Sequence, residues 1–192
     1  NKLITRVAGR LVLLPGANGF TQPDGTVVIN PSYYVYPALE AFPRLDGSPE
    51  WTRLRHDGLG WLAKARFGQW DLPPDWITID KEGTVSPAAH LPPRFGFDAI
   101  RIPLYLVWGR EATGSRLAAM MKFWGGFTDK PMPAWVDVTD GTLAPFAAPS
   151  GFHAIVDLAR GRLRAQPPPL PQIGDGDDYY SASLILLAGL AR

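Results

Sequence analysis

The sequence is dominated by segments in which apolar residues recur at helical spacing, and this pattern constrains the fold more than any other feature. Ser48 and Pro49, for example, form a helix-start signal, and the apolar residues that follow as far as Ala65 fall on one stripe. About six helices are predicted, over residues 33–42, 50–65, 98–109, 114–124, 150–163 and 178–191. None of them carries a repeat signature. We therefore expect an all-α domain.

Short strands are expected only in the connections between these helices. Leu11–Leu14 and Thr26–Ile29 are separated by Asp24-Gly25, although the loop between them is long. Trp76–Asp80 and Thr84–Ser86 flank a three-residue turn that ends in Gly83, which tolerates a positive φ. Pro-rich loops at 72–74, 91–93 and 167–171 separate the helices. Long loops on a helical scaffold are frequent locations of binding sites.

Composition excludes several classes of protein. Hydrophobic residues make up 46% and charged residues 19%, which is typical of a globular chain. The net charge is +1 without a basic stripe, so neither nucleic acid nor an anionic membrane is expected as a partner. The longest apolar stretches, Leu104–Trp108 and Leu184–Leu190, are too short to span a bilayer.

Metal and cofactor sites are not expected either. The absence of cysteine rules out disulfides, thiolate catalysis and Cys-based metal sites. The three histidines, His56, His90 and His153, lie far apart and lack the spacing of zinc ligands.

The beginning of the chain is unusual. It opens Asn-Lys-Leu-Ile-Thr-Arg-Val, with neither an initiating Met nor a signal peptide, and soon reaches what looks like the end of an element at Leu11–Gly16. We therefore expect a fragment or a processed chain whose upstream part is missing.

Asp98 is the strongest candidate for a chemical role. It follows Gly96-Phe97 and opens the apolar helix predicted at 98–109. One interpretation is a helix N-cap with Arg101 as its ion-pair partner one turn later. The other is a carboxylate kept ionised at a pocket mouth by the helix N-terminus and Arg101, as a general base requires. The residues alone leave both open.

Several segments resemble glycoside hydrolase family 8, in the family's order. Phe97–Leu104 resembles its Asp-Ala-x-Arg segment. Leu13–Gly16 and Asn30–Tyr33 resemble a family loop and its Pro-Ser-Tyr helix start. Ser150–Phe152, and Asp178–Tyr180 followed by Leu184–Leu190, resemble its last two helices. The most similar members are the periplasmic endoglucanases of bacterial cellulose synthesis complexes.

The resemblance implies a fold and site residues. The fold would be the C-terminal half of an (α/α)6 barrel, with residues 1–192 as one partial catalytic domain. Asp98 would be the general base, with Arg101 beside it and Tyr33 near the attacking water. The family inverts configuration, so a second, protonated carboxyl group must lie opposite the base. That general acid is a Glu in the family's N-terminal half, which this chain does not contain.

Aromatic residues are candidates for a sugar cleft. Trp70, Trp76, Trp124 and Trp135 lie in loops or at helix ends beside Pro or Gly, whereas Trp51, Trp61 and Trp108 fall on apolar helix stripes. We expect the first four to bind substrate and the last three to lie in the core.

The resemblance implies a function as well. It is endo-hydrolysis of a β-1,4-glucan, in the periplasm or after secretion, with a functional link to a cellulose synthase complex. Alternatives are chitosanase, lichenase or xylanase activity, or a non-catalytic carbohydrate-binding remnant, because the acid is missing. Few loop carboxylates besides Asp71, Asp75 and Asp80 could attract a cationic sugar, which favours a neutral glucan.

Overall fold

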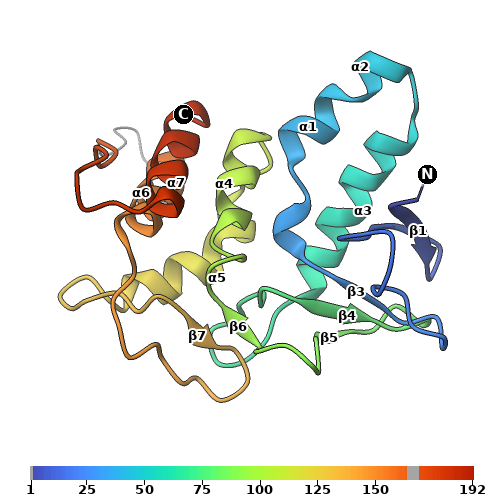
Figure 1. The fold of residues 1–192 in the computed structure, drawn as a ribbon, viewed down its shortest axis with the longest axis horizontal. Coiled ribbons are helices and arrows are strands. Elements are labelled where there is room, and N and C mark those ends of the chain that lie inside the picture. Colours follow the sequence, from blue (N-terminus) through green and yellow to red (C-terminus); the bar gives the residue numbers. More distant parts are fainter. Residues whose placement is uncertain (1, 164–168) are drawn as a thin grey trace.

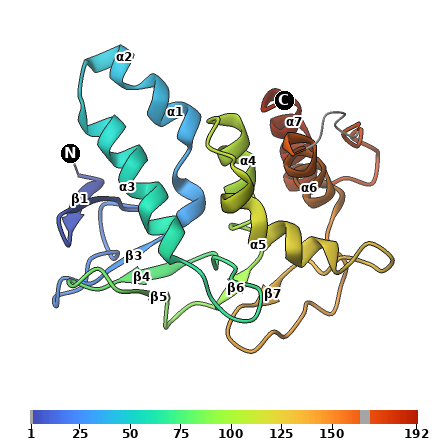
Figure 2. The same ribbon diagram turned by 180° about the vertical axis from the view of Figure 1, so that it is seen from behind.

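The computed structural model describes residues 2–163 and 169–192. The helices α1, α3, α4, α6 and α7 lie side by side, and the strands β3–β7 gather at one end of this row (Figure 1). Viewed from behind, α5 lies across that same end (Figure 2). The N-terminus, beside β1, and the C-terminus, at the end of α7, lie on opposite flanks.

The described helices are η1 Pro31–Tyr33, α1 Tyr36–Ala41, α2 Pro43–Asp46, α3 Glu50–Lys64, α4 Arg101–Trp108, α5 Gly114–Gly125, α6 Ser150–Arg162 and α7 Tyr179–Leu190. The described strands are β1 Ile4–Val7, β2 Arg10–Leu13, β3 Val27–Ile29, β4 Ile77–Ile79, β5 Val85–Pro87, β6 Arg94–Phe95 and β7 Val136–Asp137. The expected helical domain with small sheets is thus confirmed. The expected half barrel is taken up below as a proposal. Pro167 and Pro168, in one predicted loop, lie outside the described residues.

The helix boundaries follow from local capping. Ser48 Oγ accepts the Glu50 N–H at 3.3 Å, and α3 starts at Glu50. Asp178 caps α7 by accepting the Ser181 N–H at 2.7 Å. The helix predicted at 98–109 is α4, which begins at Arg101 and not at Asp98, and the short helix α2 was not predicted. Asp98 lies in the turn that precedes this helix, and its side chain caps no N–H group of the helix.

The strand pairing differs from the prediction at one hairpin. Leu11–Leu14 and Thr26–Ile29 do not pair: β2 pairs with β1, and β3 pairs with β4. The β1–β2 turn is Ala8-Gly9, in which both residues have positive φ, as a two-residue hairpin turn requires. The second predicted hairpin is confirmed, because β4 pairs with β5 and Gly83 has a φ of 82°.

The core lies among the helices and between them and the strands. On α4, Ile102, Leu104 and Leu106 are fully buried. α6 and α7 pack so closely that a Cβ on Gly151 would lie 2.7 Å from Ser181 Cα. As predicted for the core, Trp61 is buried at 1% exposure, whereas Trp51 and Trp108 are partly buried at its edge.

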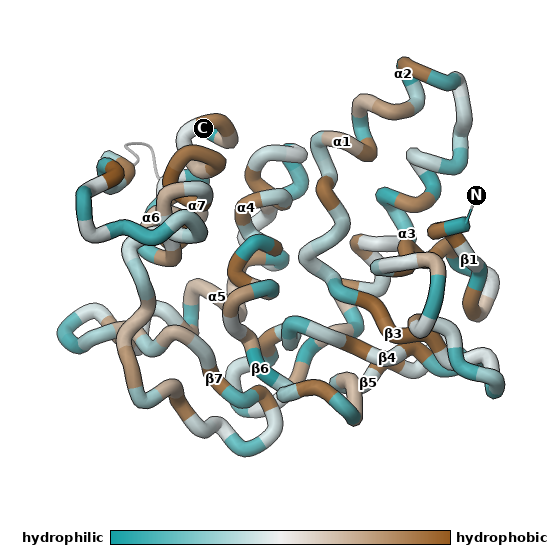
Figure 3. Tube along the Cα trace, in the orientation of Figure 1, coloured by the Kyte–Doolittle hydropathy of each residue, from teal (hydrophilic) through white to brown (hydrophobic). Residues whose placement is uncertain are grey.

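The last helix, α7, is apolar on all sides. Its inner face, with Leu184 and Ala188, is buried, yet Leu186 and Leu190 on its outer face are 60% and 69% exposed. Figure 3 shows hydrophobic colouring along much of this helix. A helix that is hydrophobic all round is normally covered on every side in a larger protein. Within the described part of the chain, no helix is long and apolar enough to cross a membrane.

Candidate active site

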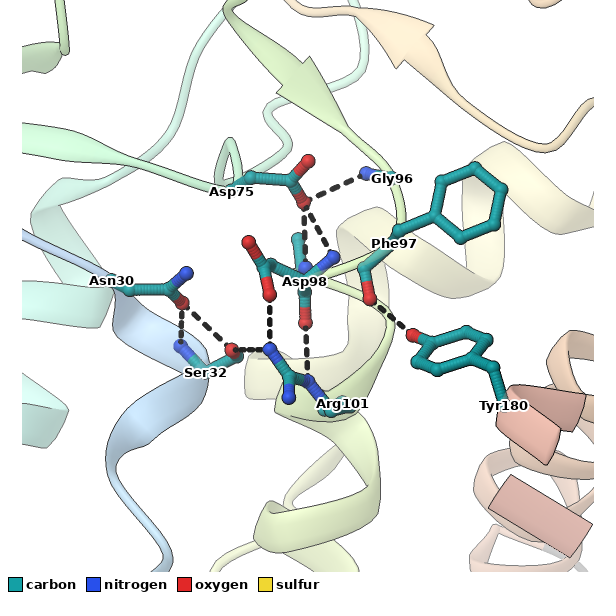
Figure 4. Close-up of polar contacts among 9 residues, drawn as sticks. Asn30, Ser32, Asp75, Gly96, Phe97, Asp98, Arg101 and Tyr180 are labelled. Atoms are coloured by element: carbon teal, nitrogen blue, oxygen red, sulfur yellow. Dashed lines mark hydrogen bonds and ion pairs between the residues drawn. The ribbon is translucent and has the colours of Figure 1, made fainter. Parts of the chain in front are cut away.

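The centre of the site is the turn that joins β6 to α4 and carries Asp98. Arg101, three residues later, donates from Nη2 to Asp98 Oδ1 (Figure 4). The Asp98 side chain is 30% exposed and the Arg101 side chain is 24% exposed, so the ion pair is partly buried but still accessible to solvent. Among the described residues, Asp98 Oδ2 accepts no hydrogen bond. The structure therefore presents a carboxylate with one oxygen fixed and the other available.

Arg101 is held from the opposite side by the segment around η1. The same Nη2 donates to Ser32 Oγ at 3.1 Å, and Ser32 Oγ bonds Asn30 Oδ1 at 2.7 Å. Asn30 also accepts the Ser32 backbone N–H at 3.0 Å, and both residues are 1% exposed. This buried chain of hydrogen bonds fixes the guanidinium, and through it the Asp98 carboxylate.

Tyr33 lies at the same place, next along the chain from Ser32. Its ring is 38% exposed, with the Arg101 guanidinium carbon 5.7 Å from the ring centroid. Trp76 approaches the Tyr33 ring edge-on, with 5.9 Å between centroids. The structure thus brings together Asp98, Arg101 and Tyr33, the three predicted catalytic residues, with Trp76 next to them.

Asp75 is part of this site, and the sequence did not single it out. Its Oδ1 accepts the backbone N–H groups of Gly96, Asp98 and Ala99 at 3.1, 3.1 and 2.7 Å (Figure 4). Burial raises the pKa of Asp75 to about 6, and the charge of Asp98 adds to this effect while the three N–H groups oppose it. The cap predicted for Asp98 is thus supplied by Asp75, from the segment before β4.

The turn is also tied to the last helix. Tyr180, in the first turn of α7, donates its hydroxyl hydrogen bond to the carbonyl oxygen of Phe97. The Phe97 ring packs on Phe152 of α6 and on Tyr180, at centroid distances of 5.1 and 5.9 Å. Burial raises the pKa of the Tyr180 phenol, so this hydroxyl remains a hydrogen-bond donor at any ordinary pH.

A groove of 390 Å³ begins at this turn. Asp98 does not itself line the groove, but Gly96 and Phe97 immediately before it do. The groove is lined by Asp75, Trp76, Leu91, Pro92, Arg94, Gly96, Phe97, Trp135, Pro145 and Phe146. Arg94 lies over the Trp135 ring, 3.7 Å from its centroid, and holds that indole in place. Partly exposed aromatic side chains such as Trp76 and Trp135 can pack against the apolar faces of sugar rings.

The four tryptophans predicted to bind substrate separate into two pairs. Trp76 and Trp135 line the groove. Trp124 is only 2% exposed, so the prediction that it faces a cleft is wrong: it lies at the end of α5 and packs on Phe95 in the core. Trp70 is partly buried edge-on against Phe123 and lies outside the groove.

Other charged residues of the described chain serve structural roles or lie in solvent. Glu111 is buried and bonded to both Arg55 and Arg116. Glu82, on the β4–β5 turn, is 63% exposed beside Lys81. Within residues 2–163 and 169–192, no group of three or more His, Cys, Asp or Glu side chains could hold a metal ion.

A partly exposed carboxylate at the end of an aromatic groove is compatible with one half of a glycosidase site, which uses a pair of carboxyl groups. Residues 1–192 match the family described as glycosyl hydrolases family 8. This chain belongs to glycosyl hydrolase family 8.

Individual relatives agree with this assignment. A probable endoglucanase of Novacetimonas hansenii is 41% identical over 192 residues, which is 99% of this chain and 55% of the relative. The crystal structure of an endoglucanase from Komagataeibacter sucrofermentans is 43% identical, with a TM-score of 0.90 over 99% of this chain and 58% of that one. A GH8 endo-beta-1,4-glucanase from an Achatina fulica gut metagenomic library is 38% identical, with the same TM-score over 99% and 58%. The chain thus spans about half the length of the curated relatives that it matches.

Proposed function

We propose that this chain contributes the part of an active site that contains the general base, and that this base is Asp98. The reaction that we propose is endo-hydrolysis of β-1,4-glucan with inversion of configuration. The observation that carries the proposal is the state of the Asp98 carboxylate. Arg101 holds Oδ1, while Oδ2 is uncommitted and the side chain is 30% exposed. A general base needs an ionised oxygen that a water molecule can reach.

The neighbouring groups support this role. Arg101 and Tyr33 lie beside Asp98, where they can orient an attacking water and the sugar ring at the cleavage point. An inverting enzyme also needs a carboxylic acid roughly 6.5–9.5 Å from its base. Asp75 lies close by, but its Oδ1 is committed to three backbone N–H groups. We therefore assign the general acid to a Glu outside this chain, as the resemblance to the family implies.

The groove favours a neutral glucan as substrate. Among the described residues that line it, Asp75 is the only carboxylate, and Arg94 adds a positive charge, so a cationic glucosamine polymer gains little there. The names of the relatives, endoglucanase and endo-beta-1,4-glucanase, point the same way. Lichenan, xylan and chitosan remain the comparison substrates.

The helices of this chain fit one half of an (α/α)6 barrel. The exposed apolar face of α7, with Leu186 and Leu190, supports this part of the proposal, because a completing set of helices would cover it. A location in the periplasm or outside the cell, beside a cellulose synthase complex, follows from the resemblance and is proposed on that basis.

The test is hydrolysis of carboxymethyl cellulose by the protein expressed from its complete reading frame. Asp98→Asn should lose nearly all turnover, by a factor of about 10³ or more, while it folds and binds cello-oligosaccharides like the wild type. The anomer first released, followed by NMR, should have inverted configuration. Wild-type turnover in Asp98→Asn would remove the base assignment. A wild type that binds cello-oligosaccharides without cleaving them would favour the non-catalytic alternative.

A further inference from the structure

Asp75 lies 23 residues before Asp98 in the sequence, yet it touches the backbone on both sides of it. The geometry is unusual for a simple helix cap, because a single oxygen serves three N–H groups, of Gly96, Asp98 and Ala99. Two of these belong to Asp98 itself and to its successor. The direction in which the Asp98 side chain leaves the backbone therefore depends on where Asp75 Oδ1 lies.

Asp75 is itself placed firmly. Its backbone N–H donates to the Arg94 carbonyl at 2.6 Å, which joins the segment before β4 to β6. Immediately after it, Trp76 packs on Tyr33 and stacks on Phe20. Trp76 also accepts the Ala88 N–H at its carbonyl, at 3.2 Å. The carboxylate thus projects from a braced segment toward the turn that carries the proposed base.

The second oxygen of Asp75 faces the groove side of the turn. A Cβ on Gly96 would lie 3.3 Å from Asp75 Oδ2, and both residues line the groove. A Cβ at this position would crowd both Asp75 Oδ2 and Trp135 Cβ, the latter at 3.0 Å, so glycine leaves Asp75 room to approach the turn. The close approach of Asp75 to the turn is therefore built into the sequence at two positions.

We propose that Asp75 is a positioning residue for the base: its carboxylate fixes the turn at Gly96–Ala99 and thereby aims Asp98 at the attacking water. The inference rests on the proposed function of Asp98. The charged and titratable groups near Asp75 are Asp98 on the turn before α4, Arg94 from β6 and Tyr180 from α7. The negative charge of Asp98 raises the pKa of Asp75, which shows that the two carboxyl groups lie near one another.

The experiment compares Asp75→Asn, which keeps an acceptor oxygen without the charge, with Asp75→Ala, which loses both. Asp80→Asn is the matched control, because Asp80 accepts the Thr84 N–H at 2.7 Å at the far end of β4. All variants are made in the complete reading frame, and kcat and KM on carboxymethyl cellulose are measured from pH 4 to pH 8 on the folded fraction. Asp75→Ala should lose kcat by a factor on the order of 10² with KM almost unchanged, because a displaced base costs about this much.

The Asp75→Asn variant distinguishes a role of Asp75 in positioning Asp98 from a role that only stabilises the fold. We expect it to retain kcat within a few fold at neutral pH, while the acidic limb of kcat/KM moves to lower pH, because a neighbouring negative charge is gone. A residue that merely stabilises the fold would leave this limb where it is. Asp80→Asn should leave both kcat and the limb unchanged.

A ¹³C NMR titration of the Asp75 carboxyl group gives a readout independent of turnover. Its midpoint should lie near pH 6 in the wild type and should fall in Asp98→Asn, because the neighbouring negative charge is gone. Two results would overturn the inference. One is an unchanged midpoint combined with wild-type kcat in the folded fraction of Asp75→Ala. The other is an unchanged midpoint combined with an unshifted acidic limb in Asp75→Asn. If the midpoint moves but Asp98→Asn remains active, the coupling of the two carboxyl groups holds and the proposed function fails.

Discussion

The hydroxyl group of Tyr180 donates to the carbonyl oxygen of Phe97, across 83 residues of sequence. This bond joins the first turn of α7 to the residue immediately before Asp98. Helix α7 is thereby hydrogen-bonded to the turn that carries the proposed base, although α7 contributes no carboxylate to the site.

Removing this hydroxyl should affect both stability and turnover. In Tyr180→Phe the Phe97 carbonyl loses its partner while the ring packing on Phe152 is kept. We expect a loss of about 1 kcal/mol in the free energy of unfolding and a several-fold drop in kcat. Tyr179→Phe is the control, because Tyr179 is 90% exposed and should tolerate the change. Urea unfolding and carboxymethyl cellulose assays measure the two effects; equal kcat in both variants would contradict the prediction.

The close crossing of α6 and α7 predicts a second effect. In Gly151→Ala the new Cβ would lie 2.7 Å from Ser181 Cα and 2.8 Å from Ser181 O, both backbone atoms that cannot move alone. We expect a loss of about 1–3 kcal/mol in the free energy of unfolding. Gly189→Ala on α7 is the matched control, since nothing lies within 4 Å of its Cβ; it should be neutral or stabilising by about 0.5–1 kcal/mol. A Gly151→Ala protein as stable as the wild type would show that the two helices separate easily.

The raised pKa of Asp75 predicts how the free energy of unfolding depends on pH. Its folded pKa of about 6 lies above the ordinary aspartate value of 3.8, so between these values the folded protein binds more protons than the unfolded chain. The stability that Asp75 contributes is therefore present below about pH 4 and is lost as the pH rises through 6. The loss is about 3 kcal/mol, at about 1.4 kcal/mol per pKa unit.

The comparison that isolates this term is urea unfolding of the wild type and Asp75→Asn at pH 4, 5, 6 and 7. The stability of the wild type relative to the variant should fall steadily over this range. A difference that is constant with pH, or that grows in favour of the wild type, would contradict the raised pKa.

The groove predicts which tryptophan binds glucan. Trp135→Ala should weaken cello-oligosaccharide binding about tenfold, because an aromatic anchor held in place by Arg94 is lost. The effect should appear in KM and in calorimetric affinity more than in kcat. Trp51→Ala on α3 is the control, because its indole bonds Asp46 outside the groove. Equal affinities for the two variants would place the glucan elsewhere.

The sequence predicted the helices well because their apolar spacing and cap residues are local signals. Asp178 before α7 and Ser48 before α3 both act as start signals in the structure. The resemblance to the family also brought Asp98, Arg101 and Tyr33 forward, and these residues do lie together.

The features that were missed depend on contacts between distant residues. Asp75 reads as one loop carboxylate among several until the structure places it against Asp98. Trp124 was assigned to a cleft because it precedes two glycines, but those glycines end a helix whose apolar face is buried. The pairing of β1 with β2 was missed because the turn uses Ala8 at a positive φ, where Asn or Gly is the usual signal.

The Asp98 turn is bonded by side chains from Asp75 and Tyr180, and its arginine is bonded by Ser32. Ser32 and Asp75 precede the turn in the sequence, whereas Tyr180 lies 83 residues after Phe97. Translation proceeds from the N-terminus at a limited rate, so the first two supports exist for some time before the third is made. A nascent chain that ends before α7 can form the arginine pair but leaves the Phe97 carbonyl without Tyr180. The Phe97 carbonyl therefore gains its partner only after α7 has been synthesised, and a translation product truncated before α7 would carry the proposed base without this support.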